Sequence, residues 1–171
     1  MARDVTRILR KLRGNPRFRV LPRTAQALLT DLILQPTLSS AGVLPLMVDK
    51  WATACDELTP DGVRADLRVL LSARFVVIDF DTFEAMICGY VRDSGVTAHR
   101  NHATTAARAA ETVDSPMLRQ ALAIELYELD RPDMAEVIEA LAPLTDPDPS
   151  AMETGSEADG IGMATGSEVD G

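Results

Sequence analysis

The chain contains 171 residues, 46% hydrophobic and only 4% aromatic, so we expect one domain of ordinary size with an aliphatic core and extensions at its ends. Its longest apolar run, residues 42–48, is too short to span a membrane, and no apolar stretch follows the charged N-terminus, which argues against membrane insertion and secretion. Cys55 and Cys88 lack CxxC spacing, so we expect reduced thiols in the core of a cytoplasmic protein.

Charge is unevenly distributed along the chain, whose formal net charge is −9. Residues 1–24 contain a single acid, Asp4, and eight basic residues: Arg3, Arg7, Arg10, Lys11, Arg13, Arg17, Arg19 and Arg23. Residues 111–171 contain fifteen acids and only two basic residues, Arg119 and Arg131. An acidic protein with this segregation can still bind a polyanion through its N-terminal end.

Residues 1–19 are predicted to form a basic arm. Their apolar residues have helical spacing, which also allows a short amphipathic helix ended by Gly14-Asn15-Pro16: Val5, Ile8, Leu9 and Leu12. A longer helix is predicted over residues 22–34, with Pro22 in its first turn and one apolar stripe.

Two further helices are predicted at residues 45–55 and from Thr59 onward. Thr59 is typical of an N-cap and Pro60 of the first helical position. The inward face of this third helix is expected to contain four residues: Val63, Leu67, Leu70 and Leu71. Its outward face is expected to contain another four: Asp61, Arg64, Ala65 and Arg68.

Two β-rich segments, residues 75–79 and 84–91, predict a hairpin with a polar turn at Asp81-Thr82. Residues 41–44 are predicted to add a third strand. Three helices followed by a hairpin is the order of a winged helix-turn-helix, here over residues 20–92. The expected fold is therefore mainly α with a small β-hairpin, an α+β class, followed by C-terminal helices.

Residues 93–144 are predicted to be a C-terminal helical extension. Helices are expected near residues 103–113 and 116–129 and after a capping box of Asp133 and Glu136. They could pack on the core or form a homodimer with a second copy. Residues 145–171 have the composition of a disordered acidic tail, with a degenerate repeat of METGSEADG and MATGSEVDG.

The basic residues suggest contacts to double-stranded DNA. Candidates from the arm, which as a flexible segment would suit phosphates and minor grooves, are Arg7, Arg10, Lys11, Arg13, Arg17 and Arg19. Arg64 and Arg68, one turn apart on the third helix, could reach base edges or phosphates. Two alternatives remain: Arg64 and Arg68 on a solvated helix face, and an arm paired with the acidic C-terminal region.

The hairpin turn is acidic, with Asp79, Asp81 and Glu84, so phosphates would be repelled there. Phe80 and Phe83 at its tip are expected either to fold back onto the core or to contact a protein. On the helix near residues 116–129, Glu125 falls inside the apolar stripe, where an arginine or an interface partner is expected.

No sequence motif predicts an enzyme. His99 and His102 have H-x-x-H spacing, but zinc would need further ligands, so we favour a polar linker with some affinity for phosphate, helped by Arg100. Nucleotide-binding, nucleophile-elbow and zinc-protease motifs do not occur. We therefore expect no catalytic residues, no cofactor and no metal.

One resemblance covers about residues 17–129. The features that support it are AQALL in the first long helix, AGVLPL, Trp51-Ala52, the hairpin VVIDFDTFE and the later DSPMLRQALAIEL. Together they resemble the N-terminal winged-helix region of actinobacterial phage replication-initiation or replisome-organiser-like proteins. The resemblance implies DNA binding at an origin and recruitment of a helicase or its loader. This chain departs from it in its acidic hairpin and its degenerate C-terminal repeat.

The expected function is DNA binding in phage replication initiation or regulation, in the cytoplasm of a bacterial host. An alternative is a non-enzymatic interaction module that engages replication or transcription proteins of the host through its acidic surface.

Overall fold

Helices form most of the chain. The computed structural model describes residues 2–94, 100–131 and 134–141. Up to residue 72 the elements are α1 (Ala2–Gly14), α2 (Pro16–Arg19), α3 (Arg23–Leu34), β1 (Val43–Pro45), α4 (Val48–Trp51), the 3-10 turn η1 (Ala52–Ala54) and α5 (Pro60–Ser72). There follow β2 (Val76–Asp79), β3 (Glu84–Ile87), α6 (Tyr90–Ser94), α7 (Arg100–Glu111), α8 (Pro116–Tyr127) and α9 (Ala135–Leu141). This confirms a mainly helical α+β protein.

Two helix starts follow from local hydrogen bonds that the sequence predicts. The Thr59 hydroxyl accepts a hydrogen bond from the Gly62 N–H at 3.1 Å, and Pro60 begins α5. At α8 the Ser115 hydroxyl accepts from the Leu118 N–H at 3.1 Å. Each bond satisfies a backbone donor that the first turn of a helix leaves free, so both start positions are confirmed.

The three strands form one antiparallel sheet in the order β1-β3-β2. Met86 of β3 lies opposite Val43 of β1 and Val77 of β2. The predicted pairing of the early strand with the hairpin is therefore confirmed.

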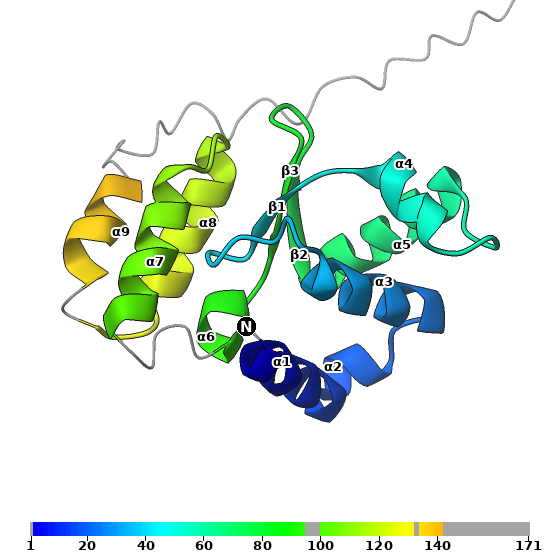
Figure 1. Ribbon diagram of the computed structural model, residues 1–171, viewed down its shortest axis with the longest axis horizontal. Coiled ribbons are helices and arrows are strands. Elements are labelled where there is room, and N and C mark those ends of the chain that lie inside the picture. Colours follow the sequence, from blue (N-terminus) through cyan, green and yellow to red (C-terminus); the bar gives the residue numbers. More distant parts are fainter. Residues whose placement is uncertain (1, 95–99, 132–133, 142–171) are drawn as a thin grey trace, which may run out of the picture.

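The sheet has a helical layer on each face, as Figure 1 shows. Successive side chains of a strand point to opposite faces, so each strand contributes to two cores. Ala85 and Ile87 of β3 belong to the core with α1, α3 and α5, whereas Met86 between them belongs to the core with α7, α8 and α9. The C-terminal helices thus pack on the sheet, one of the two arrangements expected for them.

Two elements are shorter than predicted. The helix expected at residues 45–55 is α4 followed by η1, because Pro45 pairs with Glu84 in the sheet and Met47 has an extended φ of −120°. The strand expected at residues 84–91 ends at Ile87, because Gly89 adopts a φ of +74° and α6 begins at Tyr90.

Two expectations about burial are wrong: Cys55, expected in the core, is exposed, and one leucine of α5 is not buried. Leu71 was expected on the inward face of α5, but it is 38% exposed, while Val63, Leu67 and Leu70 on that helix are buried as predicted. Leu71 lies about 100° around the helix axis from Leu70, away from the centre of the stripe that Val63, Leu67 and Leu70 form. Asp133, His99 and the tail at 145–171 lie outside the described residues.

Candidate nucleic-acid interface

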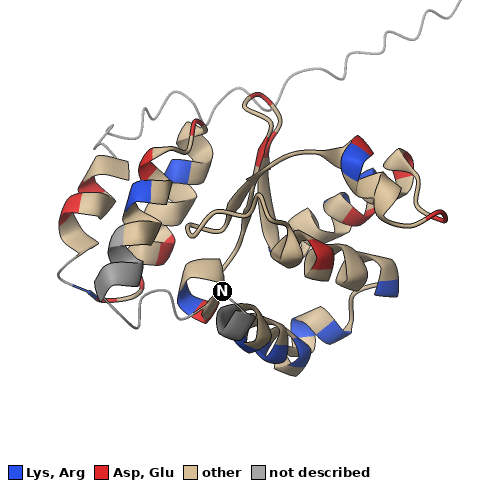
Figure 2. Cartoon of the chain, viewed as in Figure 1, with Lys and Arg blue, Asp and Glu red and all other residues tan. Residues whose placement is uncertain are grey.

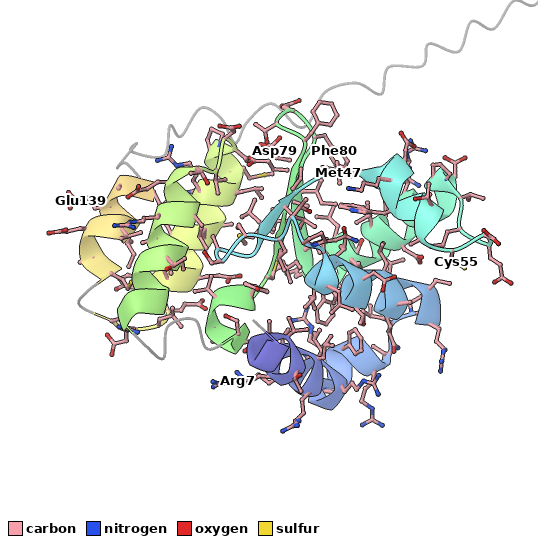
Figure 3. All side chains as sticks on the ribbon, in the orientation of Figure 1. Arg7, Met47, Cys55, Asp79, Phe80 and Glu139 are labelled. Carbon is pink, nitrogen blue, oxygen red and sulfur yellow. The ribbon has the colours of Figure 1, made fainter. Side chains whose placement is uncertain are left out.

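Helix α1 has one apolar and one basic face. Ile8 is buried, and Val5, Leu9 and Leu12 pack against the core. Arg7, Arg10 and Arg13 are exposed, and Figure 3 shows Arg7 pointing away from the rest of the protein. The arm is therefore a docked helix; the amphipathic helix is confirmed and the flexible arm is wrong. Burial of its apolar stripe fixes α1 against α2, α3 and α6.

Two basic residues of this region hold the elements together. The Lys11 ammonium lies 2.9 Å from Asp93 Oδ1, which joins α1 to α6. The Arg17 guanidinium donates to the Ala73 carbonyl at 2.5 Å and lies 5.8 Å from the centre of the Phe75 ring. Both were predicted to contact DNA, but in the structure both contact the protein itself.

Five arginines remain available, and we call them the basic surface: Arg7, Arg10, Arg13, Arg19 and Arg23. All five are exposed, and among the described side chains none forms an ion pair with them. They lie on α1, on α2 and at the first residue of α3, and Figure 2 shows the blue segments gathered there. Arg23 was counted in the basic segment of the sequence but not among the predicted site residues.

A groove of about 460 Å³ lies beside these arginines, between α1, α2 and α3. Its apolar part includes Leu9, Leu12 and Phe18. Arg13, Arg19 and Arg23 also line it, together with Asp31 further along α3. Burial raises the pKa of Asp31 above its usual range. Sequence patterns could not reveal this groove, because it depends on how α1 docks.

The arginines of α5 lie in a different setting. Arg64 Nη1 is 2.9 Å from Asp61 Oδ1, and its Nη2 is 3.8 Å from Asp49 Oδ1 on α4. Arg68 is exposed on the outer face as predicted. Helix α3 packs against both α1 and α5 and lies between them (Figure 1). Arg64 is thus paired with two acids and does not extend the basic surface.

The acids of the hairpin stabilise the start of α8. Asp79 Oδ2 accepts a hydrogen bond from the Ser115 hydroxyl at 2.5 Å, and Glu84 Oε2 accepts from the Ser115 N–H at 2.7 Å. The hydroxyl of Ser115 and then the Asp81 N–H lower the pKa of Asp79. A carboxylate near a helix N-terminus is favourable, because the backbone N–H groups there point outward. The sequence shows these acids but not their partner.

The hairpin tip exposes two aromatic side chains between its acids. Phe80 is 64% exposed and Phe83 is 65% exposed, so neither folds back onto the core. Figure 3 shows Phe80 projecting from the turn. The prediction that remains for these two side chains is a contact with a protein.

Glu125 binds a backbone amide. Its Oε1 accepts a hydrogen bond from the Gly89 N–H at 2.6 Å, a backbone partner that the sequence did not predict, and the expected arginine is near it as Arg92. Burial raises the pKa of Glu125. Burial, and then the nearby Glu125, raise the pKa of the Cys88 thiol to about 11.

Within residues 2–94, 100–131 and 134–141, no group of three His, Cys, Asp or Glu side chains is placed to hold a metal ion. In the same ranges no helix is long and apolar enough to cross a membrane. The H-x-x-H pair falls outside the described side chains. Comparison of the chain with protein-family models, with curated proteins and with solved structures finds no match.

Proposed function

We propose that the protein binds double-stranded DNA through its basic surface and acts in phage replication initiation or its regulation. The observation that supports DNA binding is the gathering of five exposed arginines without acidic partners among the described side chains. Arginine is suited to phosphate, because its planar guanidinium donates two parallel hydrogen bonds. The role in replication rests on the resemblance of residues 17–129.

The element order supports a winged-helix arrangement within this proposal. Helices α3, α4 and α5 precede the hairpin β2–β3, and β1 pairs with β3 at the edge of the sheet. In such proteins the third helix reads base edges in the major groove. Here Arg64 of α5 is paired with acids, so we assign the main contact to phosphates bound by α1, α2 and the start of α3.

The proposal is tested by measuring the affinity of the full chain for a duplex across a series of salt concentrations. Arg7→Gln, Arg10→Gln and Arg19→Gln should each weaken binding and reduce the slope of log K against log salt by roughly 0.9 per lost phosphate contact. Arg64→Gln is the matched control, because that guanidinium is already paired with Asp61. It should leave the slope nearly unchanged.

Two results would overturn the proposal. One is no binding of the unmodified chain to duplex DNA at about 50 mM salt, where electrostatic binding is strong. The other is equal slopes for the α1 and α2 variants and the unmodified chain. A loss confined to Arg64→Gln and Arg68→Gln would instead assign the contact to α5.

A second function is favoured by the hairpin tip. Two neighbouring aromatic side chains, each about two-thirds exposed, are typical of a protein contact, where aromatic residues dominate the binding energy. Phe80→Ser together with Phe83→Ser should leave DNA affinity unchanged if DNA binds only at the basic surface. Failure of DNA binding would make this interaction module, engaging host replication or transcription proteins, the leading function.

A further inference from the structure

The groove beside the basic surface has a chemical character that DNA alone does not explain. Leu9, Leu12 and Phe18 give it an apolar part, and Arg13, Arg19 and Arg23 also line it. The phosphate groups of DNA would bind the arginines, but they form no favourable contact with the apolar side chains. A peptide with both carboxylates and apolar side chains would use both parts of the groove.

The ends of the groove differ in charge. Arg23 begins α3, whereas Asp31 lies eight residues further along the same helix, a rise of about 12 Å. An acidic peptide should therefore bind with its carboxylates near α2 and the start of α3. Asp31 disfavours any carboxylate at the other end.

We propose that this groove binds the chain's own C-terminal segment, residues 144–171. Charge complementarity supports this occupant, because the segment contains no Lys or Arg and seven acids: Asp146, Asp148, Glu153, Glu157, Asp159, Glu168 and Asp170. Each copy of its repeat begins with a methionine, Met152 or Met163, an unbranched side chain that fits irregular apolar surfaces.

The length of the segment allows this contact. Residues 142–171 follow the buried Leu141 at the end of α9. At up to about 3.3–3.6 Å per residue they can extend roughly 100 Å. A folded domain of this size measures only about 40 Å across, so both copies of the repeat can reach the groove.

The contact would regulate DNA binding. Arg13, Arg19 and Arg23 belong both to the groove and to the basic surface, so carboxylates bound there compete with phosphates. This competition rests on the proposed function, whereas the docking of the segment does not.

Docking is tested by NMR on the full chain. The unmodified protein is compared with a full-length variant in which the repeat acids are replaced by amides: Glu153→Gln, Glu157→Gln, Asp159→Asn, Glu168→Gln and Asp170→Asn. Amide shifts should change at groove residues such as Ala27 and Thr30 and not at the hairpin turn. No change at the groove, or equal changes across the surface, would overturn the proposal.

A titration with the separate peptide tests which groove residues bind it. A synthetic peptide of residues 152–171 is added to the full-length amide variant. Arg19→Gln and Arg23→Gln should each weaken peptide binding about two- to five-fold, as for exposed ion pairs. Asp31→Asn should strengthen binding, and Arg64→Gln, the control outside the groove, should have no effect. Equal binding by a peptide of the same composition in scrambled order would overturn the assignment to this segment.

DNA affinity separates this proposal from the proposed function. The amide variant should bind duplex DNA more tightly than the unmodified chain, because the competing carboxylates are gone. If neither protein binds DNA while the groove shifts are present, the proposed function fails and docking stands. If both bind DNA equally while the groove shifts are present, competition is overturned.

Discussion

At the junction of the hairpin and α8, acidic side chains stabilise the fold. Ser115 is fully buried and contacts both Asp79 and Glu84 from the hairpin, while its hydroxyl also caps α8 through the Leu118 N–H. The same carboxylates that would repel phosphate therefore stabilise a helix start. Their position is explained by the fold whether or not the protein binds DNA.

Ser115→Ala should lower the free energy of unfolding by about 1–2 kcal/mol at neutral pH, the usual cost of losing a helix N-cap. The pKa of Asp79 is lowered in the folded state, so its contribution is present above the unfolded pKa of about 3.9 and is lost as the pH falls through the folded pKa. The variant lacks the main cause of that shift. The loss of stability in Ser115→Ala, relative to the unmodified protein, should therefore become smaller at acidic pH. Thermal melts of both proteins at neutral pH and at a pH below the folded pKa of Asp79 measure this change.

Thr59→Ala is the matched control for this measurement, because it removes the equivalent cap of α5. Its cost should stay nearly constant through the same pH range. A melting temperature of Ser115→Ala equal to that of the unmodified protein at pH 7 would contradict the capping role.

At the scale of elements, α5 shows how one helix is divided between core and surface. Leu67 and Leu70 are buried against α3 and the sheet, whereas Leu71 is 38% exposed. At about 100° per residue, Leu71 lies off the centre of the stripe that Leu67 and Leu70 form. The burial of each leucine should therefore determine its contribution to stability.

Leu67→Ala should cost about 2–5 kcal/mol, because it removes transfer energy and leaves a cavity in the core. Leu71→Ala, the same substitution four residues later, should cost well under half as much. Denaturant unfolding of both variants measures this difference. Equal losses would mean that Leu71 is buried in solution and that the orientation of α5 is wrong.

At the scale of the whole molecule, the sheet joins two cores. Val43 and Met86 on one face pack with Leu118 and Leu122 of α8, and Leu44 and Ile87 on the other face pack with the core of α3 and α5. The ranges 20–92 and 93–144, predicted as domain and extension, share this sheet. All three strands belong to the first range, so without the C-terminal helices one buried face of the sheet would be exposed.

A chain ended after Ser94 should therefore lose cooperative unfolding or aggregate. Exposing one fully buried apolar side chain, such as Met86 or Val91, costs about 1.5–3 kcal/mol. Exposing a few of them costs as much as the whole free energy of unfolding of a typical domain. A chain ended after Leu141 is the control and should melt near the temperature of the full chain. Thermal melts of the two truncations test this, and a cooperative melt of the shorter one would contradict a shared core.

The sequence by itself determined the elements whose causes are local. Thr59-Pro60 and Ser115-Pro116 predict helix starts because each cap bond spans three residues. The buried stripe of α3 and the outward position of Arg64 and Arg68 follow from helical spacing alone. The concentration of arginines near the N-terminus was visible in the same way.

Tertiary structure decided which of those basic residues are paired within the part of the chain that the structure describes. Arg17 is held by the Ala73 carbonyl and Lys11 by Asp93, 56 and 82 residues away. The shortened second helix likewise depends on Pro45 meeting Glu84 across the sheet. These partners depend on how the helices pack against the sheet. A local sequence pattern does not predict which distant residue lies next to a given side chain.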